Sequence, residues 1–207
     1  MLISMLFFVS VLSFANGQQS SQQQTQSQGE ALTLSHRVGG YASYEPTIGS
    51  LSKFVSCSVG GGFEYELGFP ILKIFEIGAI THVGINGNPL TDDRLTFLMN
   101  LKADIGCFFR IPLGKSGFVF TPEIDYGILV YFPKANPEYS NSEIIQGAYV
   151  DQLVQVGLGF RYMHEKILNG NLEFEITPTY LFSPEQEASI HFIGFRAGAL
   201  YRIGGTK

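Results

Sequence analysis

Apolar and polar residues alternate along most of this 207-residue chain. In the stretch LEFEITPTYLF, residues 172–182, most even-numbered positions are apolar, and the odd-numbered ones include Glu173, Glu175, Thr177 and Thr179. Successive side chains of a β-strand point to opposite faces, so this stretch predicts a strand with one polar and one apolar face. Helical periodicity is absent. The alternation predicts eight strands, at 32–45, 54–67, 73–86, 94–112, 117–132, 148–164, 171–182 and 188–203.

The connections between these segments alternate in length. Short ones join segments 2–3, 4–5 and 6–7, with the sequences GFPILK, GKSG and KILNG. The others are more polar and mostly longer: EPTIGSLSK, NGNPLTDD, PKANPEYSNSEIIQG and SPEQEAS. Short turns at one end and long loops at the other are typical of transmembrane barrels with their long loops outside the cell. The sequence therefore predicts an all-β fold, an eight-stranded antiparallel up-and-down transmembrane β-barrel with both termini on the inner side.

Two features indicate that the apolar face meets lipid, and not the interior of a soluble, lipocalin-like barrel. Glycines gather on the polar face, where they suit a cramped interior, at Gly39, Gly60, Gly62, Gly78 and Gly127. The apolar face ends in aromatic residues on both sides, as in the two interfacial belts of membrane barrels. The belts are predicted at Tyr44, Phe132, Tyr180 and Phe182 near the long loops, and at Tyr65, Phe69, Phe109, Phe118, Tyr162 and Tyr201 near the short turns.

The first 31 residues differ from the rest of the chain. MLISMLFFVSVLSF is too short an apolar run to span a membrane and is followed by small residues, which predicts a signal peptide over 1–17, cleaved near Gly17. A Gln/Ser-rich polar stretch follows, and residues 18–31 are predicted to be disordered. The barrel then occupies 32–207. A net charge of −5 provides no basic surface for nucleic acid.

The chain resembles the small eight-stranded outer-membrane barrels of the OmpA transmembrane-domain, OmpX and OmpW type. RAGALYRI, residues 196–203, is similar to the terminal assembly signal of such barrels, although the chain runs on through GGTK. The resemblance implies an outer-membrane location, contact with outer-membrane lipid, and recognition of the C-terminal strand by barrel-assembly machinery. The prolines in FTPEI and EITPT are also similar to those barrels. We expect Pro122 and Pro178 near the inner rim or at bulges, because proline removes a donor from the ladder.

An eight-stranded barrel has room inside only for side chains, so the polar face must pack against itself. The alternation predicts a network of paired charges inside the barrel, formed by Arg37, Glu64, Glu66, Glu76, Lys102, Asp104, Arg110, Glu123, Asp125, Arg161, Glu173, Glu175, Arg196 and Arg202. Buried carboxylates are costly unless they are paired. Folding through the two turns brings Glu175 level with Arg161 on one side and Arg196 on the other. The sequence therefore predicts a plugged barrel.

Catalytic and cofactor chemistry find little support in the sequence. His82 is expected inside the barrel as a satisfied interior group, and no metal-ligand spacing, phosphate-binding loop or nucleophile elbow is present. Ser189 and His191 share a face near the outer rim, which raises a lipid-modifying hydrolase as one hypothesis. No third group is apparent to orient the histidine.

Three functions remain open from the sequence. The leading one is a structural and surface-interaction protein of the adhesion type, whose outer loops contact host or envelope ligands. The alternative is a narrow channel for small solutes, hydrophobic ones among them, and the third is the rim enzyme. Cys57 shares the apolar face of segment 2 with Val59, and Cys107 shares that of segment 4 with Ile105, so we expect both to face lipid. Because segment 3 lies between their strands, we expect them to stay unlinked.

Overall fold

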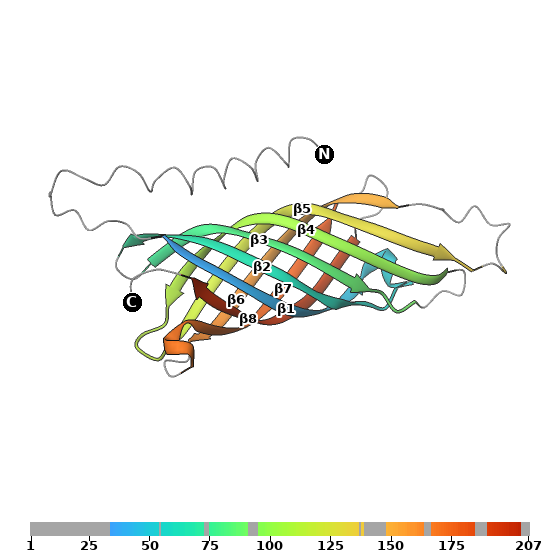
Figure 1. Ribbon diagram of the computed structural model, residues 1–207. Coiled ribbons are helices and arrows are strands. Elements are labelled where there is room, and N and C mark those ends of the chain that lie inside the picture. The colour runs from blue at the N-terminus through green and yellow to red at the C-terminus, as the bar shows by residue number, and fades with distance from the viewer. Residues whose placement is uncertain are drawn as a thin grey trace, which may run out of the picture. The chain divides into compact units, whose positions relative to one another are not determined.

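The structure, a computed structural model, describes residues 34–53, 55–72, 75–90, 95–136, 138, 148–163, 167–184 and 190–203. The predicted signal peptide and polar segment lie outside these residues, and so does Ser189. Eight strands make up the fold (Figure 1): β1 Ser35–Ile48, β2 Cys57–Leu72, β3 Phe75–Gly87, β4 Leu95–Pro112, β5 Phe118–Ala135, β6 Tyr149–Met163, β7 Leu172–Ser183 and β8 Ile190–Ile203.

The strands form a closed antiparallel barrel in chain order, which confirms the predicted fold class. Each strand pairs with the next, and β1 pairs with β8 from His36↔Ile203 to Ile48↔His191. Closure leaves no sheet edge with unpaired backbone groups, as a strand structure in lipid requires. No helix in the described part of the chain is long and apolar enough to cross a membrane.

Alternate residues along each strand are buried inside the barrel or exposed on its outer surface. In β7, Glu173 and Glu175 are buried, whereas Phe174 and Ile176 are exposed. The outer surface carries large apolar side chains in the middle of the strands, including Phe63 with 74% of its surface exposed. Because the polar side chains are inside and the apolar ones outside, the barrel has the arrangement suited to lipid, and the lipocalin-like alternative is wrong.

Successive connections lie alternately at the two ends of the barrel, but the expected division by length is only partial, because eight residues (164–171) join β6 to β7 and six (184–189) join β7 to β8. The turn after β4 contains Gly114 and Gly117, which both have positive φ angles, and the connection after β6 contains the 3₁₀ helix η3 (Leu168–Gly170). A second 3₁₀ helix, η1 (Gly49–Lys53), follows β1 at the other end. We call the end with the β2–β3, β4–β5 and β6–β7 connections the inner end and the opposite one the outer end.

Two local expectations need correction. The stretch GFPILK is not a turn: β2 continues through it to Leu72, with a register shift between Pro70 and Leu72. Pro178 is neither at the inner rim nor at a bulge, because it lies in the middle of β7 and the register with β6 is the same on both sides of it. Beside Pro178 the β6–β7 ladder lacks the residue pairs between Gly157↔Thr179 and Phe160↔Ile176. Proline removes one backbone N–H from the ladder, but this does not require the extra residue of a bulge.

The two cysteines are free and lie on strands separated by β3. Cys57 is partly buried in β2, and Cys107 is exposed on the outer surface of β4.

Candidate functional site in the barrel interior

The interior of the barrel is a column of side chains that changes character from the inner end to the outer end. Charged residues fill the inner end and the middle, and an apolar cluster fills the outer end. All of these side chains point inward for one reason, since residues two apart in a strand lie on the same face. The column is therefore the candidate functional site.

Three arginines and three glutamates share the inner end: Arg37, Arg110, Arg202, Glu66, Glu76 and Glu173. The Arg110 guanidinium donates to both oxygens of Glu173, at 2.7 and 2.8 Å, which is the bidentate geometry that makes arginine–carboxylate pairs strong. Arg37 donates two further bonds to Glu76, at 3.0 and 2.7 Å. Equal numbers of cations and carboxylates balance this end of the interior.

Arg161 lies one step further up the barrel and is the most heavily shared cation. Its Nη2 atom is 2.6 Å from Glu66 Oε1, 3.0 Å from Glu64 Oε1 and 2.9 Å from Glu175 Oε2. The register places Arg161 directly opposite Glu175 on β7. Because Arg161 is only 1% exposed, these pairs are shielded from water.

Arg196 does not sit beside Glu175 as the sequence suggested. The register pairs it with Thr177, and its guanidinium extends across the lumen to Glu123 and to His82 Nε2, at 2.7 Å from the latter. The guanidinium carbon also lies 5.3 Å from the centre of the Tyr41 ring, within the range of a cation–π contact. The sequence-based placement was wrong because it put the register between β7 and β8 two residues off: Glu175 is paired with Gly198.

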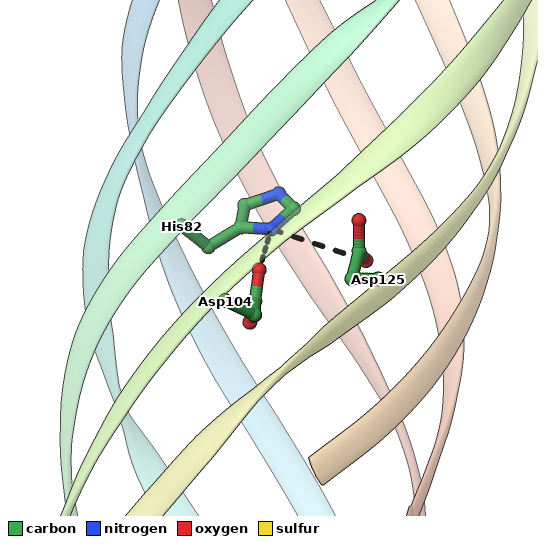
Figure 2. A group of neighbouring side chains, drawn as sticks. All are labelled: His82, Asp104 and Asp125. Atoms are coloured by element: carbon green, nitrogen blue, oxygen red, sulfur yellow. Dashed lines mark hydrogen bonds and ion pairs between the residues drawn. The ribbon is translucent and has the colours of Figure 1, made fainter. Parts of the chain in front are cut away.

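His82, Asp104 and Asp125 converge in the middle of the barrel, from the adjacent strands β3, β4 and β5 (Figure 2). His82 Nδ1 is 2.6 Å from Asp104 Oδ1 and 4.0 Å from Asp125 Oδ2. A guanidinium can only donate, so the bond from Arg196 requires the lone pair of His82 Nε2. This geometry therefore selects the tautomer in which Nδ1 carries the proton and donates a hydrogen bond to Asp104.

Two glycines make room for these carboxylates. A Cβ atom on Gly106 would collide with Asp125 Oδ1, and one on Gly127 would approach the Cβ of Asp104 to 2.6 Å. A side chain at either position would displace a member of the group, so glycine here serves close packing.

Above this group, Lys102 donates to Glu45 at 2.9 Å and to Gln155 at 3.0 Å, and Gln155 donates to Asp125 at 3.1 Å. An apolar cluster then fills the outer end: Val55, Leu98, Leu129, Tyr131, Leu153, Leu181 and Phe192. Each of its members is at most 7% exposed. The interior is thus packed with side chains at both ends.

Solved structures of other proteins share this architecture. Neisserial surface protein A matches with a TM-score of 0.51 and 8% identity, over 81% of this chain and 96% of that chain. OprG, an outer membrane protein of Pseudomonas aeruginosa, matches with 0.53 and 12%, over 87% and 100%. Ail, the attachment invasion locus protein of Yersinia pestis, matches with 0.50 and 12%, over 83% and 99%. The chain has the fold of the small eight-stranded outer-membrane barrels.

At these identities the likeness of this chain to the three proteins concerns the fold alone. No protein-family model matches the sequence, and neither does any curated protein. The interior contacts described above therefore have to be interpreted from their own chemistry.

Of the two rim residues that raised the hydrolase hypothesis, Ser189 and His191, the structure describes only His191. His191 lies on the outer surface of β8, where its Nδ1 atom is 2.7 Å from the hydroxyl of Tyr180 and its ring packs against Phe182. Ser189 falls outside the described residues. The contacts of His191 that the structure describes are those of an aromatic side chain at the barrel rim.

Three interior residues were missed or underrated in the sequence. Glu45 has the same parity as Arg37 in β1, so the alternation contained the signal that it faces inward. Gln155 has the same parity as Arg161 in β6, which predicts that it faces inward, and in the structure it links Lys102 to Asp125. His82 was regarded as an isolated interior histidine, because nothing in its local sequence shows that two aspartates from other strands surround it.

Proposed function

We propose that this protein resides in the outer membrane as a plugged, non-conducting barrel, and that it acts there as a structural and surface-interaction protein of the adhesion type. The exposed apolar surface supports insertion into lipid. Tyr201 and Ile203 of β8 are 41% and 51% exposed on that surface, which supports recognition of the last strand during assembly.

One observation carries the proposal that the barrel does not conduct. Side chains bury one another along the whole interior, from Phe192 at the outer end, 2% exposed, to Arg37 at the inner end, 1% exposed. A water-filled channel would leave such side chains accessible, as in the much wider porin barrels. The tightly paired charges would have to separate before any solute could pass.

The long connections supply the interaction surface in this proposal, and their composition is acidic. Between β1 and β2, β3 and β4, β5 and β6, and β7 and β8 they contain six acidic residues, Asp92, Asp93, Glu138, Glu143, Glu185 and Glu187, against Lys53 and Arg94. A surface of this charge favours a positively charged partner. The solved structure of Ail, by contrast, contains the heparin analogue sucrose octasulfate, which is an anion.

A narrow channel for hydrophobic solutes is the second candidate, and the apolar cluster at the outer end is the observation that favours it. In that function the cluster would open as an apolar entrance. The charged layers below it count against such a path, because an apolar solute would have to pass Arg161 and its three carboxylates.

Planar-bilayer recordings separate the two candidates. The purified full chain should add no stable conductance to the membrane, while a porin inserted under the same conditions provides the positive control. A steady open level in the recordings would contradict the plugged barrel and favour the channel.

Adhesion to charged beads tests the surface role. Cells that display the barrel should retain polylysine-coated beads and not heparin-coated beads. The control is a chain with the six loop acids changed to Asn or Gln, which should lose the retention while it still inserts. Equal retention by both chains would refute a role for the acidic loops.

A further inference from the structure

The interior charges of the barrel do not balance. Nine acidic residues are buried or nearly so: Glu45, Glu64, Glu66, Glu76, Asp104, Glu123, Asp125, Glu173 and Glu175. Six cationic residues face them: Arg37, Lys102, Arg110, Arg161, Arg196 and Arg202. Since the inner end holds three of each, the whole excess of three carboxylates lies in the middle of the barrel.

The excess can be assigned to particular side chains. In the middle of the barrel, Arg161 pairs with Glu64 and Glu175, Arg196 with Glu123, and Lys102 with Glu45. Among the described contacts, Asp104 and Asp125 are the two buried acids that have neither an arginine nor a lysine as partner.

Neither of these two carboxylates is satisfied by the protein alone. Their described partners are His82 and Gln155. Asp104 and Asp125 are 5% and 1% exposed, and one oxygen of each, Oδ2 and Oδ1 respectively, has no hydrogen-bond partner. Buried carboxylates in this condition require a cation or a proton.

We propose that His82, Asp104 and Asp125 form a binding site for a divalent first-row metal ion of the zinc type. One potential ligand atom from each residue lies within 4.8 Å of the others. Two ligand atoms of a tetrahedral ion are about 3.4 Å apart. The 2.6 Å contact between His82 and Asp104 therefore opens, and the 4.0 Å separation between His82 and Asp125 closes, each by less than about 1 Å.

The mixture of one imidazole and two carboxylates decides the class of ion. Imidazole nitrogen suits zinc and its first-row neighbours, whereas calcium and magnesium prefer oxygen ligands throughout. The ion takes the lone pair of His82 Nδ1, and the ring proton then resides on Nε2. The Arg196 guanidinium, which can only donate, must then give up its 2.7 Å contact with Nε2 and keeps its pairing with Glu123. Glu64 Oε2 lies 3.6 Å from Nε2 and is placed to accept that proton in a hydrogen bond, an arrangement typical of metal-bound histidines.

A packed interior leaves no open route, so the ion enters while the barrel folds. The full chain is therefore refolded from urea into detergent micelles with Zn²⁺, and in parallel with Mn²⁺ or Ca²⁺, washed with chelator, and analysed by elemental mass spectrometry. We expect one Zn²⁺ per chain and no retained Ca²⁺. Chain refolded with Co²⁺ should show the visible absorption bands of a tetrahedral site with nitrogen and oxygen ligands.

Variants locate the ion. Asp125→Asn and His82→Gln, each close in shape to the residue it replaces, should lower the retained Zn²⁺ at least tenfold. Asp151→Asn provides the matched control, because Asp151 is a half-buried acid of β6 outside the cluster, and it should retain the ion.

Two results overturn the proposal. If the wild-type barrel folds and retains neither Zn²⁺ nor Mn²⁺, protons neutralise Asp104 and Asp125 instead. If Zn²⁺ is retained equally by the folded Asp125→Asn and His82→Gln variants, it is bound elsewhere. Should one variant fail to fold, the other variant and the wild-type metal content still decide the question. None of these outcomes depends on whether the barrel conducts or adheres.

Discussion

Arg161 is the cation on which three buried carboxylates converge, and Arg161→Leu removes it while keeping an apolar side chain in its place. Glu66 retains Arg37 at 3.3 Å, whereas Glu64 retains only the unprotonated Nε2 of His82, at 3.6 Å. Glu175 has no other described cationic partner. Removing one member of a buried ion pair costs about 3–5 kcal/mol, because the remaining charge is uncompensated. The unfolding equilibrium constant should therefore rise roughly 100- to 4,000-fold.

Urea unfolding in detergent micelles measures this effect. Far-ultraviolet circular dichroism is a suitable signal, because the barrel is almost entirely strand and the chain contains no tryptophan for fluorescence. Arg202→Leu is the matched control: Arg202 is 19% exposed, its contact with Glu173 is 3.3 Å long, and its loss should cost about 1 kcal/mol or less.

A double variant distinguishes pairing from packing. Arg161→Leu combined with Glu175→Leu removes one of the two carboxylates left without a cation, so the second change should recover part of the lost stability. If Arg161→Leu unfolds at the wild-type urea concentration, or if the second change only adds to the loss, the ion-pair geometry described for this layer is wrong.

Three further predictions concern the membrane, the topology and the cysteines. Phe63→Lys should destabilise the barrel in lipid vesicles by about 2–4 kcal/mol, and Phe132→Lys near the outer end by about 0–1 kcal/mol, because the cost of a charge falls toward the interface; equal costs in urea unfolding would place Phe63 outside the hydrocarbon region. An epitope tag at Ser140 should be labelled by antibody on intact cells and one at Ser116 should not, whereas the reverse pattern would invert the topology. Both cysteines should react as free thiols in denatured, unreduced protein, and a disulfide-linked peptide found by mass spectrometry would contradict the strand order.

The alternation of the sequence determined the architecture of this protein. Which face each side chain occupies is a local property of an extended backbone, so Glu175 could be placed inside and Phe174 outside without any knowledge of the fold. Counting residues through the turn between β6 and β7 also sufficed to bring Arg161 opposite Glu175. The exact ends of strands were less predictable, since β2 continues through a proline into the expected turn.

Only the tertiary structure decided which charges meet across the lumen. Arg110 of β4 binds Glu173 of β7, and Lys102 of the same strand binds Glu45 of β1. These strands are not neighbours, so their relative height depends on the tilt and stagger of the closed barrel. The group formed by His82, Asp104 and Asp125 depends instead on the register between adjacent strands, which pairs His82 with Asp104 and Gly106 with Asp125. Parity places each of these side chains inside, but the register of neighbouring strands and, across the lumen, the closure of all eight strands set the distances between them.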